Sequence, residues 1–329
     1  MAEFNGVIQV LAAEPAHGGT GFKLCQFFRY AAAEGQRQVQ LWMPPQSRIP
    51  AGSPWQPLLD TGFLRPQPHP NPALLLLSDA ADWRAAQRFY PGRRNLPKLQ
   101  LLWGDDLRCW GHGARDQAAI RVALGSSVAE VLQRCSRFRE PLHTMSVGLN
   151  PEDLPAAVLG DRGDQVLILA SANPGLGLAL QHNLRQRQFN CLCELTPWPL
   201  QRWLTLLSHA AVAVVLAPPA GQPSLGLHRL ASMALRTPLV AEQRDPDDGL
   251  CRDGANCLVR PGDPAALADA AAALLDPANS GLRAKLVDGG LASLVRHRRA
   301  RERLEFNQLL EQLSLHWQQA IRCHPELET

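Results

Sequence analysis

The sequence predicts an α/β protein with two Rossmann-like domains followed by C-terminal helices. Three observations carry this prediction. The chain has 329 residues, which suits two domains better than one. Short apolar runs alternate with helical patterns in two separate series, and such alternation is typical of parallel sheets covered by helices. A stretch rich in Gly, Pro and Asp, around residues 150–164, separates the two series as a hinge would.

The first series opens with a strand–helix–strand unit. "GVIQVLAA" reads as a buried strand, "EPAHGGTG" as a loop, "FKLCQFFRYAAAEG" as a helix ended by Gly35, and "QVQLWMP" as the next strand. The Pro-rich residues 44–72 are expected to form a long loop. Further along, "ALLLLSDA" and "LQLLWGDD" are strands, and "AIRVALGSSVAEVLQRCSRF" holds a strand followed by a helix.

The second series has strands at "QVLILAS", "NCLCEL", "AVAVVLAP" and "PLVAEQ". Helical segments lie between them at "GLALQHNLRQRQ", "PLQRWLTLLSHA" and "LHRLASMAL", and "GDPAALADAAAALLD" is an Ala-rich amphipathic helix. More helices are expected from about Gly281 to Cys323. The predicted organisation is therefore a first domain at residues 1–155, a second at 156–300 and a helical tail at 301–329.

Composition excludes disorder and gives little sign of nucleic-acid binding. Apolar residues make up 46% of the chain and charged residues 19%, as in ordinary globular proteins, and the formal net charge is only +3. One dense basic run occurs, "RHRRARER" at Arg296–Arg303. It lies in a helical stretch that also contains acids, so we interpret it as a solvated helix face, with nucleic-acid binding as the minority alternative.

The N-terminal residues and the cysteines predict a cytoplasmic protein. We find no signal-peptide pattern and no apolar run of the ~18–20 residues that a membrane-spanning helix needs. The eight cysteines are scattered without a Cys-x-x-Cys motif, which predicts reduced thiols and neither a zinc site nor a disulfide framework. Cys191 and Cys193 are expected to point to opposite faces of a strand.

The glycine-rich stretch "HGGTGFK" follows a strand and opens a helix. Free backbone amides and the helix dipole make such a position an anion site, so Gly18, Gly19, Thr20 and Gly21 are candidates to contact a phosphate or sugar. The stretch lacks the third glycine and the acidic residue of a dinucleotide fingerprint, and the sequence has no P-loop motif. An NAD(P) site and a P-loop nucleotide site are therefore disfavoured. A tight turn that needs glycine only for its backbone angles is the open alternative.

Two stretches of the second half carry a resemblance to a known family. "PSLGLHRLASMALRTPLVA", from Pro223, and "CRDGANCLVRPGDPAALADAAAALL", from Cys251, resemble the donor-binding region of the retaining family-four glycosyltransferases of the GT-B fold. "HGGTG" resembles that family's N-terminal glycine loop. The resemblance implies metal-independent transfer of a sugar from a nucleotide-sugar to a glycan, lipid or small-molecule acceptor. No cofactor is implied, because the nucleotide-sugar is the substrate.

The same resemblance assigns the donor to the C-terminal half. Ser224, Leu225 and Gly226 stand where the family contacts its nucleotide-sugar. His228 and Arg229 follow on the first turn of the next helix, where a basic side chain could meet the diphosphate. For Arg229 the alternative is an exposed surface arginine, which is the default for this residue type.

The N-terminal half is implied to present the acceptor. In "LLWGDDLRCWGHG", Asp105, Asp106 and His112 come just after a predicted strand. A carboxylate or imidazole at that position could orient an acceptor hydroxyl or take its proton, so these three are the candidate catalytic residues. The alternative for the two aspartates is that they cap the following turn or helix.

The sequence also departs from the family pattern. Pro223 and Ala231 stand at the two positions of the family's acid-x7-acid motif, and "LILASANPGLGLAL" has neither Arg nor Lys where the family has a basic pair. Arg236 replaces a helix-terminating glycine that often needs a left-handed backbone. The alternative function is therefore a catalytically degenerate GT-B protein that acts as a binding or partner subunit. The sequence predicts no oligomeric state.

Overall fold

A computed structural model of the chain describes residues 6–13, 19–33, 37–47, 49, 53–103, 117–134, 141–149, 154, 162–196, 200–218, 225–243 and 249–324. The chain forms two compact units. The first unit combines Met1–Ser146 with Glu302–Thr329, and the second unit is Val147–Arg301. The sequence predicts domain boundaries at residues 155 and 300, with residues 301–329 as a separate helical tail. In the structure, the C-terminal helices are part of the first unit.

The first unit contains a seven-stranded sheet among its described residues, with all neighbouring strands parallel. The strand order is β3-β2-β1-β4-β5-β6-β7. Several of these strands are buried on both faces, as parallel strands between helical layers are. The strands are β1 Val7–Leu11, β2 Gln38–Trp42, β3 Leu64–Arg65, β4 Leu74–Leu77, β5 Lys98–Leu102, β6 Ile120–Leu124 and β7 Leu142–Met145.

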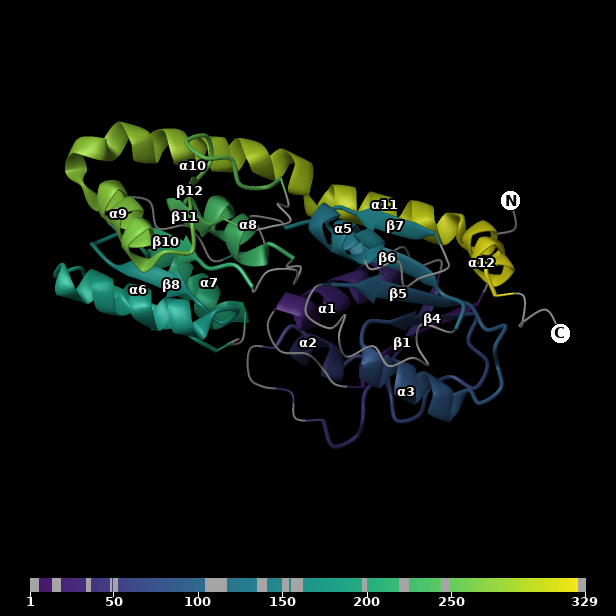
Figure 1. The fold of residues 1–329 in the computed structure, drawn as a ribbon. Helices are drawn as coiled ribbons and strands as arrows, with labels where there is room; N and C mark the ends of the chain where they lie inside the picture. The colour runs from purple at the N-terminus through teal and green to yellow at the C-terminus, as the bar shows by residue number, and fades with distance from the viewer. Residues whose placement is uncertain are drawn as a thin grey trace. The chain divides into compact units, whose positions relative to one another are not determined.

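Helices of the first unit come from both ends of the chain (Figure 1). They are α1 Gly19–Ala32, α2 Gln56–Leu59, α3 Ala80–Phe89, α5 Ser126–Arg134, α11 Arg299–Glu311 and α12 Leu313–Arg322. Helix α3 begins at a capping box: Asp79 accepts a hydrogen bond from the Asp82 amide at 2.9 Å, and Asp82 accepts one from the Asp79 amide at 3.3 Å. Helix α11 crosses the boundary between the units at Arg301.

The start of helix α1 and the Pro-rich segment differ from the sequence prediction, which also names neither helix α3 nor strand β7. Helix α1 begins at Gly19, three residues earlier than expected, because the glycines at its start take helical geometry rather than a loop. The Pro-rich residues 44–72 contain the short helix α2 and the edge strand β3. Trp55 anchors this segment with a fully buried side chain. Burial of a large aromatic residue offsets the cost of ordering a Pro-rich segment.

A buried ion pair fixes the C-terminal helices to the first unit. Lys23 Nζ on α1 lies 2.5 Å from Glu302 Oε1 on α11, and both side chains are completely buried. Tyr30 donates a hydrogen bond of 2.7 Å to the other oxygen of Glu302. Phe27 packs edge-on against Phe306, with ring centroids 5.0 Å apart. These contacts join segments nearly 280 residues apart in the sequence.

The second unit contains a five-stranded parallel sheet among its described residues, in the order β12-β11-β10-β8-β9. Its strands are β8 Val166–Leu169, β9 Cys191–Glu194, β10 Val212–Val215, β11 Leu239–Glu242 and β12 Leu258–Arg260. Its helices are α6 Pro174–Gln186, α7 Leu200–His209, α8 Leu227–Ala234, α9 Pro264–Leu275 and α10 Ser280–Leu294. Helix α6 packs beside α9, and α7 beside α8, while α10 lies against α8 (Figure 1).

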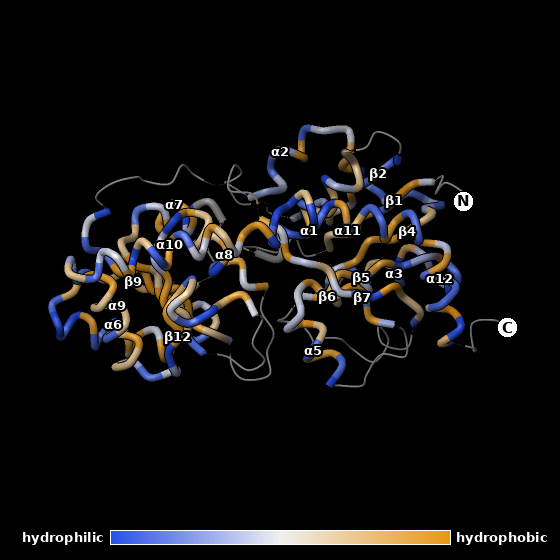
Figure 2. Tube along the Cα trace, turned by 90° about the horizontal axis from the view of Figure 1, so that it is seen from above, coloured by the Kyte–Doolittle hydropathy of each residue, from blue (hydrophilic) through white to orange (hydrophobic). Residues whose placement is uncertain are grey.

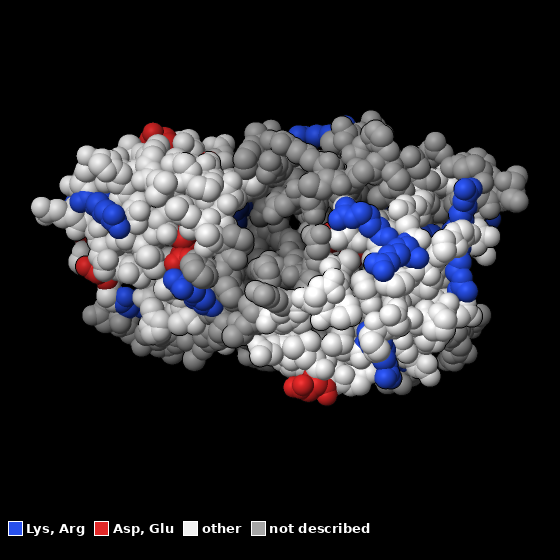
Figure 3. All heavy atoms as spheres, turned by 90° about the horizontal axis from the view of Figure 1, so that it is seen from below, with Lys and Arg blue, Asp and Glu red and all other residues white. Residues whose placement is uncertain are grey.

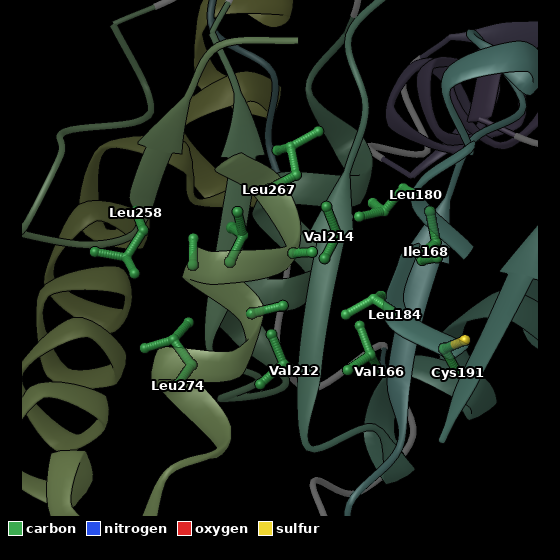
Figure 4. Packing of buried hydrophobic residues seen from close by; sticks show 14 of the residues in the cluster. Val166, Ile168, Leu180, Leu184, Cys191, Val212, Val214, Leu258, Leu267 and Leu274 are labelled. Carbon is green, nitrogen blue, oxygen red and sulfur yellow. The ribbon is translucent and has the colours of Figure 1, made fainter. Parts of the chain in front are cut away.

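Alternate residues of the central strands form the core beneath α6 and α9 (Figure 4). Val166 and Ile168 of β8 contact this cluster, and Leu180 and Leu184 of α6 pack onto them, all fully buried. Burial of each such side chain stabilises the fold by about 1.5–3 kcal/mol. In the first unit, strand β4 consists of four leucines and lies in a hydrophobic stretch of the tube in Figure 2.

The expectation that Cys191 and Cys193 point to opposite faces of β9 is wrong. Both residues pack against the cluster that contains Val166 and Ile168. Residues two apart in a strand point to the same face, since side chains alternate with a period of two. Burial, followed by the neighbouring Cys191 and Glu194, raises the pKa of the Cys193 thiol to about 11.

The basic run at residues 296–303 is solvated, as predicted. Arg296, Arg298, Arg301 and Arg303 are exposed, whereas Glu302 between them is buried. The run is not one helix, because a short 3-10 helix ends at His297 before α11 begins at Arg299. On the face shown in Figure 3, Lys and Arg side chains form separate groups rather than one continuous stripe.

None of the described helices is long and apolar enough to span a membrane.

Candidate functional site

The carboxyl edge of the second sheet is the place where a ligand is expected. In open parallel sheets, ligands bind beyond the carboxyl ends of the strands, where the strand order reverses. In the second unit this reversal lies between β10 and β8. The backbone joins the two strand ends there, since the Leu216 amide donates to the Leu169 carbonyl at 3.1 Å. The segments that leave β8, β10 and β11 therefore frame the candidate site.

Helix α8 begins at this edge through a left-handed glycine. Gly226 has φ 66° and precedes the first helical residue, Leu227. Its carbonyl accepts the first helical hydrogen bond, from the Leu230 amide at 2.9 Å. A left-handed residue costs glycine little and other residues more, which explains Gly at this position. The predicted donor residues Leu225 and Gly226 thus lead directly into α8, while Ser224 lies outside the described residues.

Arg229 lies on the first turn of α8 and is buried. Only 3% of its surface is exposed, so the alternative of a surface arginine is wrong. Its charge influences the pKa values of three groups: it opposes the burial-driven rise in the pKa of Glu242, and it also lowers the pKa of His228 and opposes the rise for Cys257. A guanidinium stays protonated in proteins, whether buried or exposed. The second unit therefore holds a permanent positive charge beside the start of α8.

Glu242 is the last residue of β11 and therefore lies at the same carboxyl edge of the second sheet. Its Oε2 accepts a hydrogen bond of 2.7 Å from the amide of Ala217, just after β10. Burial raises the pKa of Glu242, and the Ala217 amide and the Arg229 charge oppose that rise. Gly262 leaves room for the carboxylate, because a Cβ there would lie 2.5 Å from Oε1. Glu242 is not among the site residues predicted from the sequence. It lies in the predicted strand "PLVAEQ", and an acid near the carboxyl end of such a strand could have indicated a ligand contact.

His228 is placed next to Arg229 but carries no charge at neutral pH. Its ring packs edge-on against Trp203 of α7, with centroids 4.7 Å apart. Burial, followed by the charge of Arg229, lowers the pKa of His228 to about 4. Of the two predicted basic residues, then, Arg229 supplies charge, whereas His228 supplies a neutral ring that can donate or accept one hydrogen bond.

The second stretch of family resemblance forms a braced loop beside these residues. Within it, Asn256 accepts a hydrogen bond from the Arg252 amide at 2.7 Å and donates to the Leu250 carbonyl at 2.8 Å. Asn256 also donates to Ser293 Oγ on α10 at 2.8 Å. The loop ends at Cys257, which is fully buried and lies within reach of the Arg229 charge. Helix α10 therefore holds this loop in place from outside.

The turn after β8 has the shape of an anion site without a charged residue. Asn173 caps α6 by accepting a hydrogen bond from the Leu176 amide at 3.4 Å. The first turn of α6 lies very close to the end of β8, because a Cβ on Gly177 would be 2.3 Å from the Cβ of Ala170. The family resemblance places a basic pair in this segment, and the segment contains neither Arg nor Lys at its turn from Ala170 to Gly177.

In the first unit, the glycine stretch opens α1 at the corresponding edge. The strand order reverses between β1 and β4, and α1 follows β1. Gly19, Thr20 and Gly21 form its first turn, while Gly18 lies outside the described residues. Asp82 holds the end of β1 in place by accepting a 2.8 Å hydrogen bond from the Ala13 amide. The amides of this first turn are thus positioned at a ligand-binding edge.

The predicted catalytic residues Asp105, Asp106 and His112 all lie outside the described residues, so their roles stay predictions. Trp103, just before them, is buried at the end of β5. Among the described residues no group of three or more His, Cys, Asp and Glu side chains could hold a metal ion.

Solved glycosyltransferase structures are similar to this chain over nearly its full length. A sucrose-phosphate synthase from Thermosynechococcus elongatus covers 94% of this chain and 99% of its own, with a TM-score of 0.67 at 13% identity. HepE from Anabaena, in complex with UDP and glucose, covers 92% and 98%, with a TM-score of 0.67 at 12% identity. A glycosyltransferase from Rickettsia africae covers 95% and 99%, with a TM-score of 0.64 at 10% identity.

No protein-family model matches the chain, and no curated protein sequence matches it either. At such low identity, similarity of structure establishes the fold, while function has to be argued from the site. The similarity extends over almost the whole length of these proteins, and so includes both parallel sheets of this chain. The chain has the GT-B fold of glycosyltransferases, as its sequence predicts.

Proposed function

We propose that the chain is a glycosyltransferase that binds its nucleotide-sugar at the carboxyl edge of the second sheet. The observation that carries this proposal is the buried Arg229 on the first turn of α8, beside Glu242. A permanently charged arginine at a helix N-terminus is suited to a diphosphate, because the guanidinium and the helix dipole both favour negative charge. The fold supports the same choice, since this edge is where α/β sheets bind ligands.

Catalysis by such a site rests on stabilising the leaving diphosphate. As the bond between sugar and phosphate breaks, negative charge grows on the diphosphate, and fixed donors that face this charge lower the barrier. Arg229 and the amides at Leu225 and Gly226 are those donors in the proposed mechanism. They offset the charge without a metal ion, so the transfer is expected to be metal-independent.

Glu242 takes the part of a carboxylate that the acid-x7-acid motif no longer provides. Its Oε2 is engaged by the Ala217 amide, and its second oxygen can accept a hydrogen bond from a ribose or sugar hydroxyl. A hydrogen bond to a charged group contributes about 1.5–3 kcal/mol. Glu242 therefore compensates for Pro223 and Ala231 from a neighbouring strand rather than from α8.

The first unit would present the acceptor, a glycan, lipid or small molecule with a free hydroxyl. The amides of Gly19, Thr20 and Gly21 would contact a phosphate or sugar, and Asp105, Asp106 or His112 would orient the hydroxyl or accept its proton. Retention of configuration at the sugar follows only from the family resemblance. The cytoplasmic location likewise stays a sequence-based prediction.

One observation favours a second candidate, a GT-B protein that binds but does not transfer. The turn after β8, from Ala170 to Gly177, has no cationic side chain. A diphosphate at this edge would therefore lack the two basic side chains that the resembling family has in this segment. A protein of this second kind would bind a partner or a glycan and leave nucleotide-sugars unchanged.

Calorimetry with nucleoside diphosphates and nucleotide-sugars tests the donor site. UDP is the first probe, because the similar structures of HepE and of pneumococcal GtfA are complexes with UDP. We expect saturable binding by the full chain and about 10- to 100-fold weaker binding by Arg229→Gln, corresponding to the loss of one or two charge-assisted hydrogen bonds. Arg296→Gln is the matched control, since Arg296 is exposed on the same unit.

Two further measurements separate the candidate functions. Thermal melting of Arg229→Gln shows whether the variant is folded, and Arg229→Lys, which keeps the charge, should retain part of the affinity. Release of UDP from UDP-sugars in the presence of hydroxyl acceptors reports transfer. Absence of binding to every nucleotide at millimolar concentration would contradict the donor site, and binding without turnover would favour the second candidate.

A further inference from the structure

Two cysteines lie at the ends of a short closed loop in the second unit. Residues 250–257 are folded back on themselves by Asn256, which bonds both Arg252 and Leu250. The Gly254 amide donates to the Cys257 carbonyl at 2.9 Å. This closure brings the thiols of Cys251 and Cys257 into a hydrogen bond with each other. Neither residue is in a disulfide in the structure.

The two thiols differ in exposure, and the pKa of the buried thiol is raised. Cys257 is fully buried, whereas Cys251 is partly exposed. The hydrogen bond to Cys251 and burial together raise the pKa of Cys257. A thiol that stays protonated and donates to its neighbour favours the thiolate form of that neighbour. An accessible attacking cysteine and a buried cysteine in contact with it are the arrangement that thiol–disulfide exchange requires.

Three other described cysteines lack this combination. Cys25 is buried and donates a 3.2 Å hydrogen bond to the Pro54 carbonyl. Cys191 is buried and donates to the Gln181 carbonyl at 3.7 Å. Cys193 lies beside Cys191 on β9, but the elevated pKa of its thiol keeps it protonated at neutral pH. The Cys191 and Cys193 pair is therefore a matched comparison within the same unit.

We propose that Cys251 and Cys257 form a reversible intramolecular disulfide on reaction with a small-molecule disulfide such as oxidised glutathione. The thiolate of Cys251 attacks one sulfur of the oxidant, whose S–S bond breaks and releases one thiolate. Cys257 then loses its proton to solvent, and its sulfur attacks the Cys251 sulfur and releases the second thiolate. The protein loses two protons and two electrons, and the oxidant becomes two thiols.

The new bond would lie next to the charged residue of the candidate site. Cys257 is within reach of the Arg229 charge, and the loop is tied to α10 through Asn256 and Ser293. The disulfide replaces the hydrogen bond between the two thiols by a covalent bond in the loop that α10 contacts. It thereby makes the wall of the site beside Arg229 sensitive to the thiol–disulfide balance. This inference does not depend on which ligand the site binds.

Mass spectrometry of the oxidised full chain tests the proposal. The reduced protein is incubated with oxidised glutathione, quenched with acid and N-ethylmaleimide, unfolded and digested with trypsin. Cleavage after Arg252 places Cys251 and Cys257 on different peptides. We expect these two peptides to be recovered as one linked species, lighter by two hydrogens than their sum, and to separate after treatment with dithiothreitol.

Variants assign the roles of the two thiols. Cys251→Ser should lose the linked species and react with oxidised glutathione about tenfold more slowly in this loop, because the accessible nucleophile is gone. Cys257→Ser should instead accumulate glutathione on Cys251, because the resolving thiol is gone. Cys191→Ser should leave the linked species unchanged. Circular dichroism verifies folding, and Cys257→Ala replaces Cys257→Ser if the hydroxyl is not tolerated in the buried position.

Four outcomes would overturn the proposal. The first is a glutathione adduct on Cys251 that persists in the unmodified protein. The second is the absence of any oxidation in this loop, and the third is formation of a Cys191–Cys193 link at the same rate. A link between two chains, seen on a non-reducing gel in place of the intramolecular one, would count against it equally.

Discussion

His228 and Arg229 are neighbours in the sequence, yet their environments give them different chemistry. Both were predicted as basic residues for a diphosphate. Packing against Trp203 and repulsion from Arg229 keep the His228 ring neutral, whereas the guanidinium of Arg229 stays charged although it is buried. The reason lies in their intrinsic pKa values, since burial can deprotonate an imidazole near pH 7 but not a guanidinium.

The lowered pKa of His228 predicts that the protein loses stability in mild acid. The folded pKa is about 4, below the ordinary value of 6.5, so between these pH values the unfolded chain binds a proton that the folded protein does not. The free energy of unfolding therefore falls as pH falls through this window, by about 2 kcal/mol between pH 7 and pH 5. Urea titrations at the two pH values measure this difference.

His228→Gln is the control for that prediction. It removes the titration, so the loss of stability between pH 7 and pH 5 should shrink relative to the unmodified protein. Glu242 has a raised pKa and acts in the opposite direction, because its folded form binds protons more readily. Glu242 is present in both proteins, so its effect cancels in the comparison. Equal pH dependence in the two proteins would contradict the assignment.

Arg236 occupies the left-handed position that the family gives to glycine, and the structure confirms that backbone requirement. Its φ is 58° at the end of α8. A non-glycine residue in this region costs about 1 kcal/mol. Arg236→Gly should therefore stabilise the protein by roughly 0.5–1 kcal/mol, after allowance for the flexibility of glycine in the unfolded chain.

Arg236→Ala separates strain from charge at this position. Repulsion by Arg236 contributes to the lowered pKa of Arg162, and alanine removes that repulsion while it keeps the left-handed strain. Thermal denaturation of both variants should rank Gly above Ala. A ranking with Ala equal to or above Gly would show that strain at residue 236 is not limiting.

At the scale of elements, the contact of α10 with the loop at residues 250–257 depends on one glycine. Gly289 faces this loop, and a Cβ there would lie 1.9 Å from the Ala255 carbonyl oxygen. Backbone of the loop would have to move, and Asn256 with it. The sequence pattern predicts α10 as a helix, but it does not predict which face of the helix must carry glycine to leave room for the loop.

Gly289→Ala is expected to destabilise the protein by about 1–3 kcal/mol, the usual cost of overpacking. Gly281→Ala in the same helix is the matched control, because nothing lies within 4 Å of its Cβ position. That substitution should stabilise α10 by up to about 1 kcal/mol through helix propensity. Urea denaturation measures both, and equal effects of the two substitutions would contradict the predicted clash.

At the scale of the whole molecule, the chain returns to its first unit through α11 and α12. The buried pair of Lys23 and Glu302, with Tyr30, fixes this return. Removal of one partner leaves an uncompensated buried charge, so Lys23→Met alone should cost about 3–5 kcal/mol. Replacement of both partners should cost clearly less than the sum of the single substitutions.

A double-mutant cycle with Lys23→Met and Glu302→Leu measures this coupling. Denaturation of the four proteins gives the interaction energy, which is expected to be large because the two groups share one buried network. Asn307→Ala, on the same helix, is the comparison, since Asn307 accepts a 3.1 Å hydrogen bond from Arg37 but is not part of the ion pair. Additive effects of the Lys23 and Glu302 substitutions would contradict the anchoring role.

Local patterns in the sequence determined the fold class and most of the elements. Apolar runs such as Leu74–Leu77 and helical repeats such as Pro264–Leu275 are set by residues close together in the chain, which is why periodicity and caps predicted them. The stretch from Leu225 to Arg229 was identified as a candidate site for the same reason. Strand β3 and helix α2 escaped prediction because the Pro-rich residues around them have no periodic pattern.

The arrangement of charged groups in the site depends on contacts that form only in the folded chain. Glu242 meets the Ala217 amide because β10 and β11 are neighbours in the sheet, and Arg229 acts on both Glu242 and Cys257 from a third element. The thiols of Cys251 and Cys257 meet because Asn256 closes their loop. Burial and charge at a point depend on all groups around it, including those far away in the sequence, so no local pattern contains them.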